Sequence, residues 1–104
     1  MGEQRAIDEW QRLVNQEALR RWPGMTIESE GLALSEEAGE VCRAILKRRE
    51  GTRGTPNQWT QQLALEIGQA MFVLLNIAML EGLTASDVLN FAWAKLLTKP
   101  DREP

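Results

Sequence analysis

The sequence predicts an all-α fold, a four-helix bundle-like subunit that assembles as a homo-oligomer. Three observations support it: breaks rich in glycine and proline divide the chain, apolar residues recur between the breaks at helical spacing, and no segment alternates with the period of a strand. The expected helices lie near 3–21, 27–49, 56–81 and 85–98. With 104 residues, the chain forms a single domain, 1–104, with frayed ends near 1–2 and 99–104.

Residues suited to helix capping follow each break. Thr26 comes shortly after the break Trp22-Pro23-Gly24 and is expected to cap the second helix. Thr55–Gln58 and Thr84–Asp87 each place threonine three residues before a side chain that can return a hydrogen bond, the pattern of a capping box. Pro56 stands at the first helical position, where its missing N–H costs nothing. These signals predict where the last three helices begin.

Apolar side chains form a stripe along each of the two long middle helices. The stripes consist of Leu34, Ala38, Val41 and Ile45 in the second helix and Leu63, Ile67, Ala70, Leu74 and Ile77 in the third. Residues 70–75 of the third helix are apolar without interruption, and a helix that is apolar all round is usually buried on all sides. We therefore expect this stretch to lie at the centre of the subunit, at an interface between subunits, or both.

The composition excludes several classes of chemistry. The sequence contains no histidine, so Ser-His-Asp and Cys-His mechanisms and histidine-ligated zinc are excluded. The single cysteine, Cys42, cannot form an intrachain disulfide, and the polar N-terminus does not resemble a signal peptide, so we expect a cytoplasmic location. The net charge of −3 and the lack of a long apolar run favour neither a nucleic acid polymer nor a membrane as a partner.

The two middle helices share a polar pattern at a constant offset. Glu37 and Glu40 in the second helix correspond to Glu66 and Gln69 in the third, and each pair encloses a glycine. Residues at i and i+3 project from the same side of a helix, so each pair borders its apolar stripe. Glu36 points away from the stripe and is expected to be solvated. If the two helices pack as an antiparallel hairpin, the four polar side chains converge.

Carboxylates clustered at the edge of a core need water or a cation between them. Ligation by oxygen alone selects Mg²⁺, Mn²⁺ or Ca²⁺ over zinc, and Mg²⁺ keeps open positions that substrate phosphates fill. The spacing therefore favours metal-assisted phosphate chemistry. It leaves open a second interpretation, in which the acids form a solvated helix face in a purely structural bundle.

Glu36-Glu37-Ala-Gly-Glu40-Val, followed by Glu66-Ile-Gly-Gln69, resembles the paired acidic motif of the MazG-like, all-α nucleoside triphosphate pyrophosphohydrolases. The likeness extends from about Trp22 to Lys95. It implies a four-helix subunit in a homodimer or a dimer of dimers, and an enzyme that hydrolyses a nucleoside triphosphate to the monophosphate and pyrophosphate. It also implies Mg²⁺, with Mn²⁺ as a substitute, held by the acidic positions.

Gln69 departs from that motif, in which aspartate is usual. An amide oxygen still ligates a hard cation, but it brings no charge and cannot act as a base. The resemblance therefore implies Glu37, Glu40 and Glu66 as metal ligands, with Gln69 at the fourth position. We expect Glu37 or Glu40 to be the catalytic residue that orients or deprotonates water. The alternative function is a non-catalytic helical dimerisation or nucleotide-sensing module that lost activity through Gln69.

Four further residues are candidates for binding the substrate. Arg49 and Arg53 close the second helix, where they complement the helix dipole or clamp a triphosphate. Lys95 matches a basic position on the last helix of the family and is a candidate phosphate contact. Trp22, in the first break, either stacks on a base or packs in the core.

Overall fold

The computed structural model describes residues 5–51 and 54–100. This part of the chain contains four helices and no strand, which confirms the all-α prediction. The helices are α1 (Ile7–Arg21), α2 (Ile27–Glu50), α3 (Pro56–Leu80) and α4 (Ala85–Leu97).

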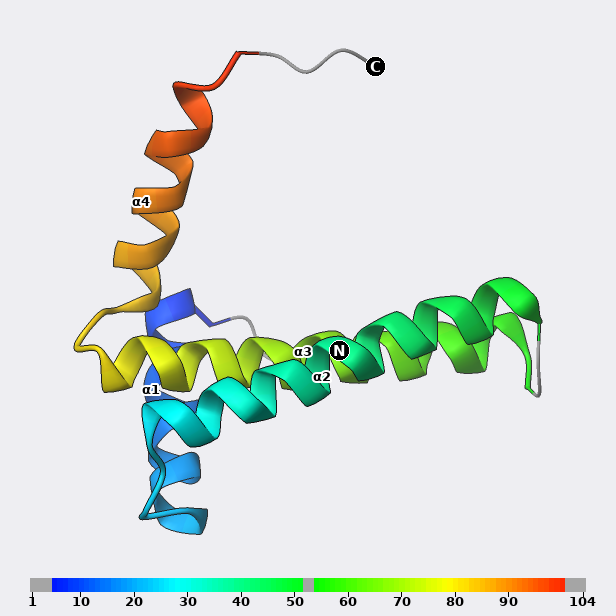
Figure 1. The fold of residues 1–104 in the computed structure, drawn as a ribbon, viewed down its shortest axis with the longest axis horizontal. Helices are drawn as coiled ribbons and strands as arrows, with labels where there is room; N and C mark the ends of the chain where they lie inside the picture. Colours follow the sequence, from blue (N-terminus) through cyan, green and yellow to red (C-terminus); the bar gives the residue numbers. More distant parts are fainter. Residues whose placement is uncertain (1–4, 52–53, 101–104) are drawn as a thin grey trace.

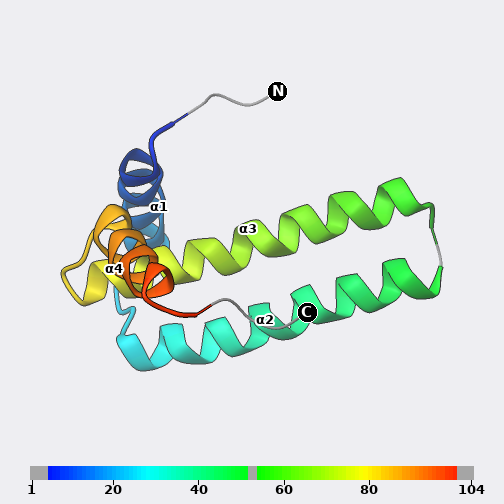
Figure 2. The same ribbon diagram turned by 90° about the horizontal axis from the view of Figure 1, so that it is seen from above.

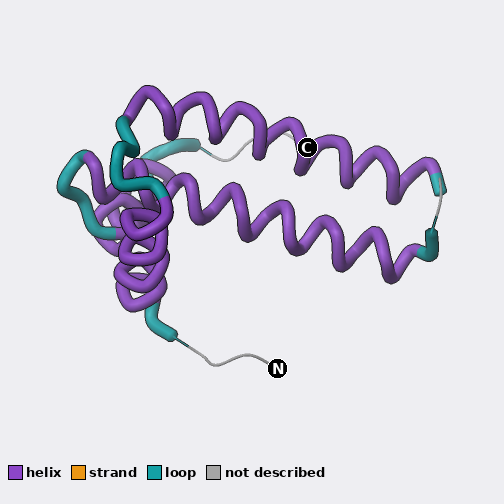
Figure 3. The backbone as a smooth tube through the Cα atoms, turned by 90° about the horizontal axis from the view of Figure 1, so that it is seen from below, coloured by secondary structure: helices purple, strands orange, loops and turns teal. Residues whose placement is uncertain are grey.

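A long antiparallel hairpin of α2 and α3 is the main feature of the fold (Figure 1). The two shorter helices lie at the end of the hairpin where α3 finishes, and α4 projects away from it (Figure 2). α1 packs on α3 and α4, whereas α2 packs on α3 alone. Figure 3 shows the two hairpin helices running side by side over their full length. α1 and α2 therefore do not pack directly on each other.

The predicted caps are confirmed at the start of three helices. The side chains of Thr26, Thr55 and Thr84 each accept a hydrogen bond from the backbone three residues on, and each belongs to a complete capping box. α2 ends at Gly51, whose φ of 68° lies in the left-handed region that glycine adopts without strain. The sequence thus encodes locally the starts of α2, α3 and α4 and the end of α2.

The predicted start of the first helix is wrong. We expected it near residue 3, but α1 begins at Ile7, and Ala6 has an extended backbone with no side-chain cap. Asp8, in the first turn of α1, accepts a hydrogen bond from the backbone N–H of Ser86 at the start of α4, at 2.8 Å. Without a local cap, the helix begins later than its composition suggests.

A buried polar network joins α1 to the turn between α3 and α4. Gln11 donates from Nε2 to the carbonyl oxygen of Leu83, at 3.0 Å, and accepts at Oε1 from the backbone N–H of Ala85, at 2.7 Å. Asn15 donates to the side-chain oxygen of Asn76, at 2.9 Å. These bonds satisfy groups that burial has removed from water, and they fix the direction in which α4 leaves the hairpin.

The apolar core of a single chain is small. Among the described residues, the buried apolar side chains are Ala18, Ala44, Leu75, Ala78 and Ala85. The radius of gyration, 16.2 Å, exceeds the value of about 13 Å that a compact domain of this length would have. Of the stretch 70–75, only Leu75 is buried, whereas Leu74 is half exposed. Residues 70–75 are therefore not buried on all sides within one chain.

By length and composition alone, α3 is apolar enough to cross a membrane. The central helices of soluble proteins meet the same criterion. Because α3 pairs along its length with α2 and carries Glu66 at that face, we interpret it as the central helix of the subunit.

Candidate active site between α2 and α3

Glu37 lies half buried on α2, on the side that faces the hairpin partner. Its Oε2 atom is buried and has no hydrogen-bond partner within the described part of the chain. Burial raises the pKa of the Glu37 carboxyl, and the negative charges of Glu66, Glu40 and Glu36 raise it further. The hairpin therefore brings the predicted acidic residues close enough to interact.

Glu66 is only 8% exposed, so its position on α3 removes it from most of the solvent. The side-chain amide of Gln62 donates to its Oε1 atom at 2.6 Å, from one helical turn before it. Such a bond orients a carboxylate and leaves its other oxygen free. Sequence reasoning missed Gln62, although its spacing of four residues from Glu66 is a signal that could have identified it.

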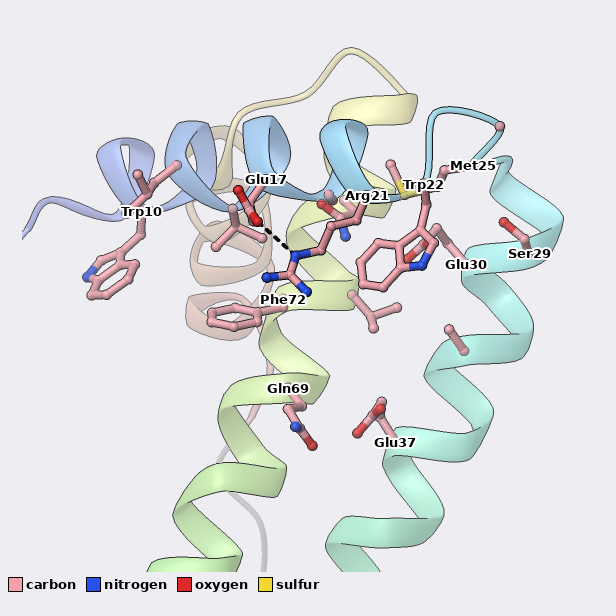
Figure 4. Close-up of a pocket in the computed structure, with 17 residues that line it drawn as sticks. Trp10, Glu17, Arg21, Trp22, Met25, Ser29, Glu30, Glu37, Gln69 and Phe72 are labelled. Carbon is pink, nitrogen blue, oxygen red and sulfur yellow. Dashed lines mark hydrogen bonds and ion pairs between the residues drawn. The ribbon is translucent and has the colours of Figure 1, made fainter.

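Gln69 and Glu40 complete the predicted set. In Figure 4 the amide of Gln69 on α3 and the carboxylate of Glu37 on α2 are turned toward the space between the helices. Glu40 lies 3.7 Å from Nη1 of Arg43, in an exposed ion pair that contributes little energy. Glu36 is exposed, as predicted, and points to solvent.

These residues fit a hard divalent cation by the chemistry of their donors. They offer three carboxylates and one amide oxygen, and a buried carboxylate oxygen without a partner is the group that a cation would satisfy. As they stand, no three acidic or cysteine side chains in residues 5–51 and 54–100 form a ready-made metal cage. Binding an ion therefore requires side-chain rotations. Fewer of them are needed for Mg²⁺, because Mg²⁺ usually keeps several of its water ligands.

The glycines of the two motifs do not mark a close approach of backbones. A Cβ atom added at Gly39 or at Gly68 would meet no heavy atom within 4 Å. Within one chain, these two positions therefore do not require glycine for close packing of backbones. The glycines instead leave open space beside the acidic residues.

A pocket of about 1010 Å³ opens from the acidic site toward α1. Glu37 and Gln69 line its wall at the hairpin, and the part toward α1 is mainly apolar. The apolar residues include Trp10, Leu13, Trp22, Met25, Phe72 and Val73. An apolar cavity with a few polar groups at one end is typical of a site for a small organic ligand.

A family model for the MazG nucleotide pyrophosphohydrolase domain matches residues 25–102. The chain belongs to the MazG family. No curated protein and no solved structure matches it. The matched range includes α2, α3 and α4 and all four residues of the acidic set, so MazG membership agrees with the site that the geometry brings together.

The four substrate-binding candidates of this MazG chain lie at different distances from the acidic site. Trp22 lines the pocket of the acidic site. Arg49 is exposed near the end of α2, nine residues beyond Glu40, and Arg53 lies outside the described residues. Lys95 is exposed in the last turn of α4, which does not pack on α2. Of the three candidates that the structure describes, only Trp22 lines the pocket.

Sequence reasoning also missed three charged pocket residues, Glu17, Arg21 and Glu30. Glu17 on α1 accepts a hydrogen bond from Nε of Arg21 at 2.7 Å, and both line the pocket. The adjacent arginines lower the pKa of Glu17 to about 2. Glu30 on α2 is buried in the same wall. The i to i+4 spacing of Glu17 and Arg21 is a readable signal, whereas nothing in the sequence marks Glu30 as buried.

Proposed function

We propose that this MazG chain is a Mg²⁺-dependent pyrophosphohydrolase that converts a nucleoside triphosphate into the monophosphate and pyrophosphate. The observation that carries the proposal is the buried Glu37 oxygen, which has no partner within the described residues and belongs to an acidic cluster beside a large apolar pocket. An acidic cluster suits a metal-bound phosphate chain, and the apolar part suits a base.

The metal ligands in this proposal are Glu37, Glu40, Glu66 and Gln69, and Mn²⁺ can replace Mg²⁺. When bound, the ion supplies positive charge to the phosphate oxygens and lowers the pKa of water. The family's usual dependence on Mg²⁺ supports this choice.

Glu37 is the preferred general base, with Glu40 as the other candidate. A base works best when its pKa approaches the pH of the reaction, and burial and neighbouring charge move the pKa of Glu37 in that direction. Its carboxylate accepts a proton from the attacking water as the P–O bond between the α- and β-phosphates breaks. Gln62 keeps Glu66 oriented during this step.

Four residues contact the substrate in this proposal. Trp22 stacks on the base, because it offers a broad aromatic face in the pocket. Arg49, Arg53 and Lys95 neutralise the phosphates and the departing pyrophosphate. Because α4 projects from its own hairpin, we propose that Lys95 acts on the site of a second subunit.

Self-association as a homodimer or a dimer of dimers completes this proposal. Large apolar side chains along α4 are exposed to solvent in a single chain. The most exposed are Leu89, Phe91, Trp93, Leu96 and Leu97, with Phe91 82% exposed. Surfaces of this kind are covered by a partner in soluble proteins. We further propose a cytoplasmic location, and neither a membrane nor a nucleic acid polymer as partner.

Leu74→Glu tests the assembly, because Leu74 is half exposed on α3. Light scattering should give an oligomer for the wild type and a monomer or an aggregate for Leu74→Glu. The matched control is Gln61→Glu on the exposed side of the same helix. A monomeric wild type, or an unchanged oligomer of Leu74→Glu, would contradict the proposed interface.

Release of pyrophosphate from a panel of ribo- and deoxyribonucleoside triphosphates, with Mg²⁺ and with chelator, tests the function. We expect Mg²⁺-dependent release from at least one substrate, with the monophosphate as the other product. The neutral Gln69 favours a second function, a nucleotide-sensing module. That module would be stabilised by Mg²⁺ and nucleotide and would release no pyrophosphate.

A further inference from the structure

The pocket wall contains a second buried carboxylate that the proposed reaction does not use. Glu30 on α2 is 9% exposed and lines the same pocket as Glu37. Its side chain forms no hydrogen bond and no ion pair in the part of the chain that the structure describes. Its carboxylate oxygens are not among the buried atoms without a partner, so they reach the space of the pocket, where donors of a ligand can meet them.

Two side-chain donors that line the same wall bond to groups other than Glu30. Nε of Arg21 donates to Glu17, at 2.7 Å, and the hydroxyl of Ser29 donates to the carbonyl oxygen of Thr26, at 2.9 Å. Figure 4 shows Arg21 joined to Glu17, with Glu30 nearer to Trp22 and Met25. The pocket therefore keeps two acceptor oxygens available at its apolar end.

Glu30 and Glu37 lie on the same face of α2, since seven residues make two helical turns, about 10 Å along the axis. This inference rests on the proposed function, in which the phosphates lie at Glu37. The base of the nucleotide is then the part that extends toward Trp22 and Glu30.

We propose that Glu30 determines base specificity and that the substrates are guanine nucleotides. A carboxylate only accepts hydrogen bonds, through two oxygens side by side. Guanine presents two adjacent donors, N1–H and the 2-amino group, whereas adenine and cytosine place one donor beside an acceptor and thymine places its donor between two acceptors. Guanine alone among these bases satisfies both oxygens of Glu30.

The comparison of dGTP with dITP tests this assignment, because hypoxanthine lacks only the 2-amino group. With wild-type protein and Mg²⁺, we expect kcat/KM for dGTP to exceed that for dITP by about tenfold or more. Glu30→Gln should remove most of this preference, because an amide presents a donor to one of the two guanine donors. Glu28→Gln, at an exposed position two residues earlier, is the matched control and should retain the preference.

Equal hydrolysis of dGTP and dITP by the wild type, or an unchanged ranking in Glu30→Gln, would overturn the assignment while leaving the proposed function intact. If no triphosphate releases pyrophosphate, the proposed function fails, and titration calorimetry with dGMP and dIMP decides the base. Tighter binding of dGMP that is lost in Glu30→Gln would support the assignment. Equal binding, or binding of neither, would overturn it.

Discussion

At the junction of α1 with the turn between α3 and α4, the buried side chains of Gln11, Asn15 and Asn76 all form hydrogen bonds. Between α2 and α3, a buried oxygen of Glu37 has no partner among the described residues and lies near other negative charges. Both regions place polar groups out of water, but only the first satisfies them.

This difference separates the stabilising part of the molecule from the part available for chemistry. A satisfied buried network makes one arrangement of the helices strongly preferred. A cluster of like charges with an unpaired oxygen destabilises the free protein, and such unfavourable groups persist at sites where a ligand compensates for them.

The largest expected effect is the loss of catalysis in Glu37→Gln. The substitution removes the proposed base and a metal ligand, so kcat/KM should fall by at least about 100-fold. Glu36→Gln changes the neighbouring, exposed carboxylate and should remain within about twofold of the wild type. Steady-state release of pyrophosphate gives both values. Loss in Glu36→Gln with full turnover in Glu37→Gln would show that the helical phase is wrong.

At the satisfied junction, Gln11→Ala should destabilise the protein by about 2–3 kcal/mol. The substitution leaves the backbone N–H of Ala85, in a residue only 1% exposed, without its acceptor. Gln16→Ala changes an exposed glutamine of the same helix and should cost less than about 0.5 kcal/mol. Urea denaturation of both variants measures the difference, and equal stabilities would mean that the junction network contributes nothing.

Gln69→Asp should make the acidic region more dependent on metal. A fourth carboxylate should strengthen Mg²⁺ binding by about tenfold and raise the rate of hydrolysis. In chelator it should lower the melting temperature, because it adds another negative charge to the cluster. Titration calorimetry and thermal denaturation check the two effects. Gain of neither would favour the nucleotide-sensing module.

The smallest effects concern pH in the metal-free protein. The pKa of Glu17 falls from 4.5 to about 2, so its stabilisation is complete above pH 4.5 and disappears as the pH falls toward 2. The pKa of Glu37 is raised above 4.5. The ionised carboxylate therefore destabilises the folded protein at a pH above the raised pKa, and this effect disappears as the pH falls toward 4.5.

At pH 7 in chelator, Glu17→Gln should therefore be less stable than the wild type and Glu37→Gln more stable. Near pH 4.5, the difference in stability between Glu37→Gln and the wild type should be smaller than at pH 7. The difference for Glu17→Gln should be nearly unchanged. Denaturation midpoints at several pH values test this pattern. It is contradicted if both differences have the same sign at pH 7.

Much of the fold could be predicted because its signals are local. Thr26, Thr55 and Thr84 cap their helices through residues three positions away, and these starts are correct. The start of α1 has no such signal, because Ala6 at its N-cap offers no side-chain cap. Asp8 accepts from the backbone of Ser86, a contact distant in sequence that no local signal predicts. The direction of α4 depends on Gln11 for the same reason.

The acidic set of the site could be predicted from its repeated spacing, since residues three apart share a helix face. Glu30 has no such partner, and its burial follows from how the segment after α1 approaches α2. For Lys95, the sequence indicated a role that the structure of one chain cannot test. The resemblance marked it, but only an assembly of chains can bring it to a site.

Thermal denaturation of the wild type and Glu37→Gln, each in chelator and across a Mg²⁺ titration, tests the central claim most directly. In chelator, Glu37→Gln should melt at the higher temperature, because it removes a charge that is disfavoured by partial burial and by the neighbouring carboxylates. With saturating Mg²⁺, the order should reverse, because a ligand stabilises only the folded state that binds it. If the two proteins keep the same order at every Mg²⁺ concentration, the cluster at Glu37 is not a metal site.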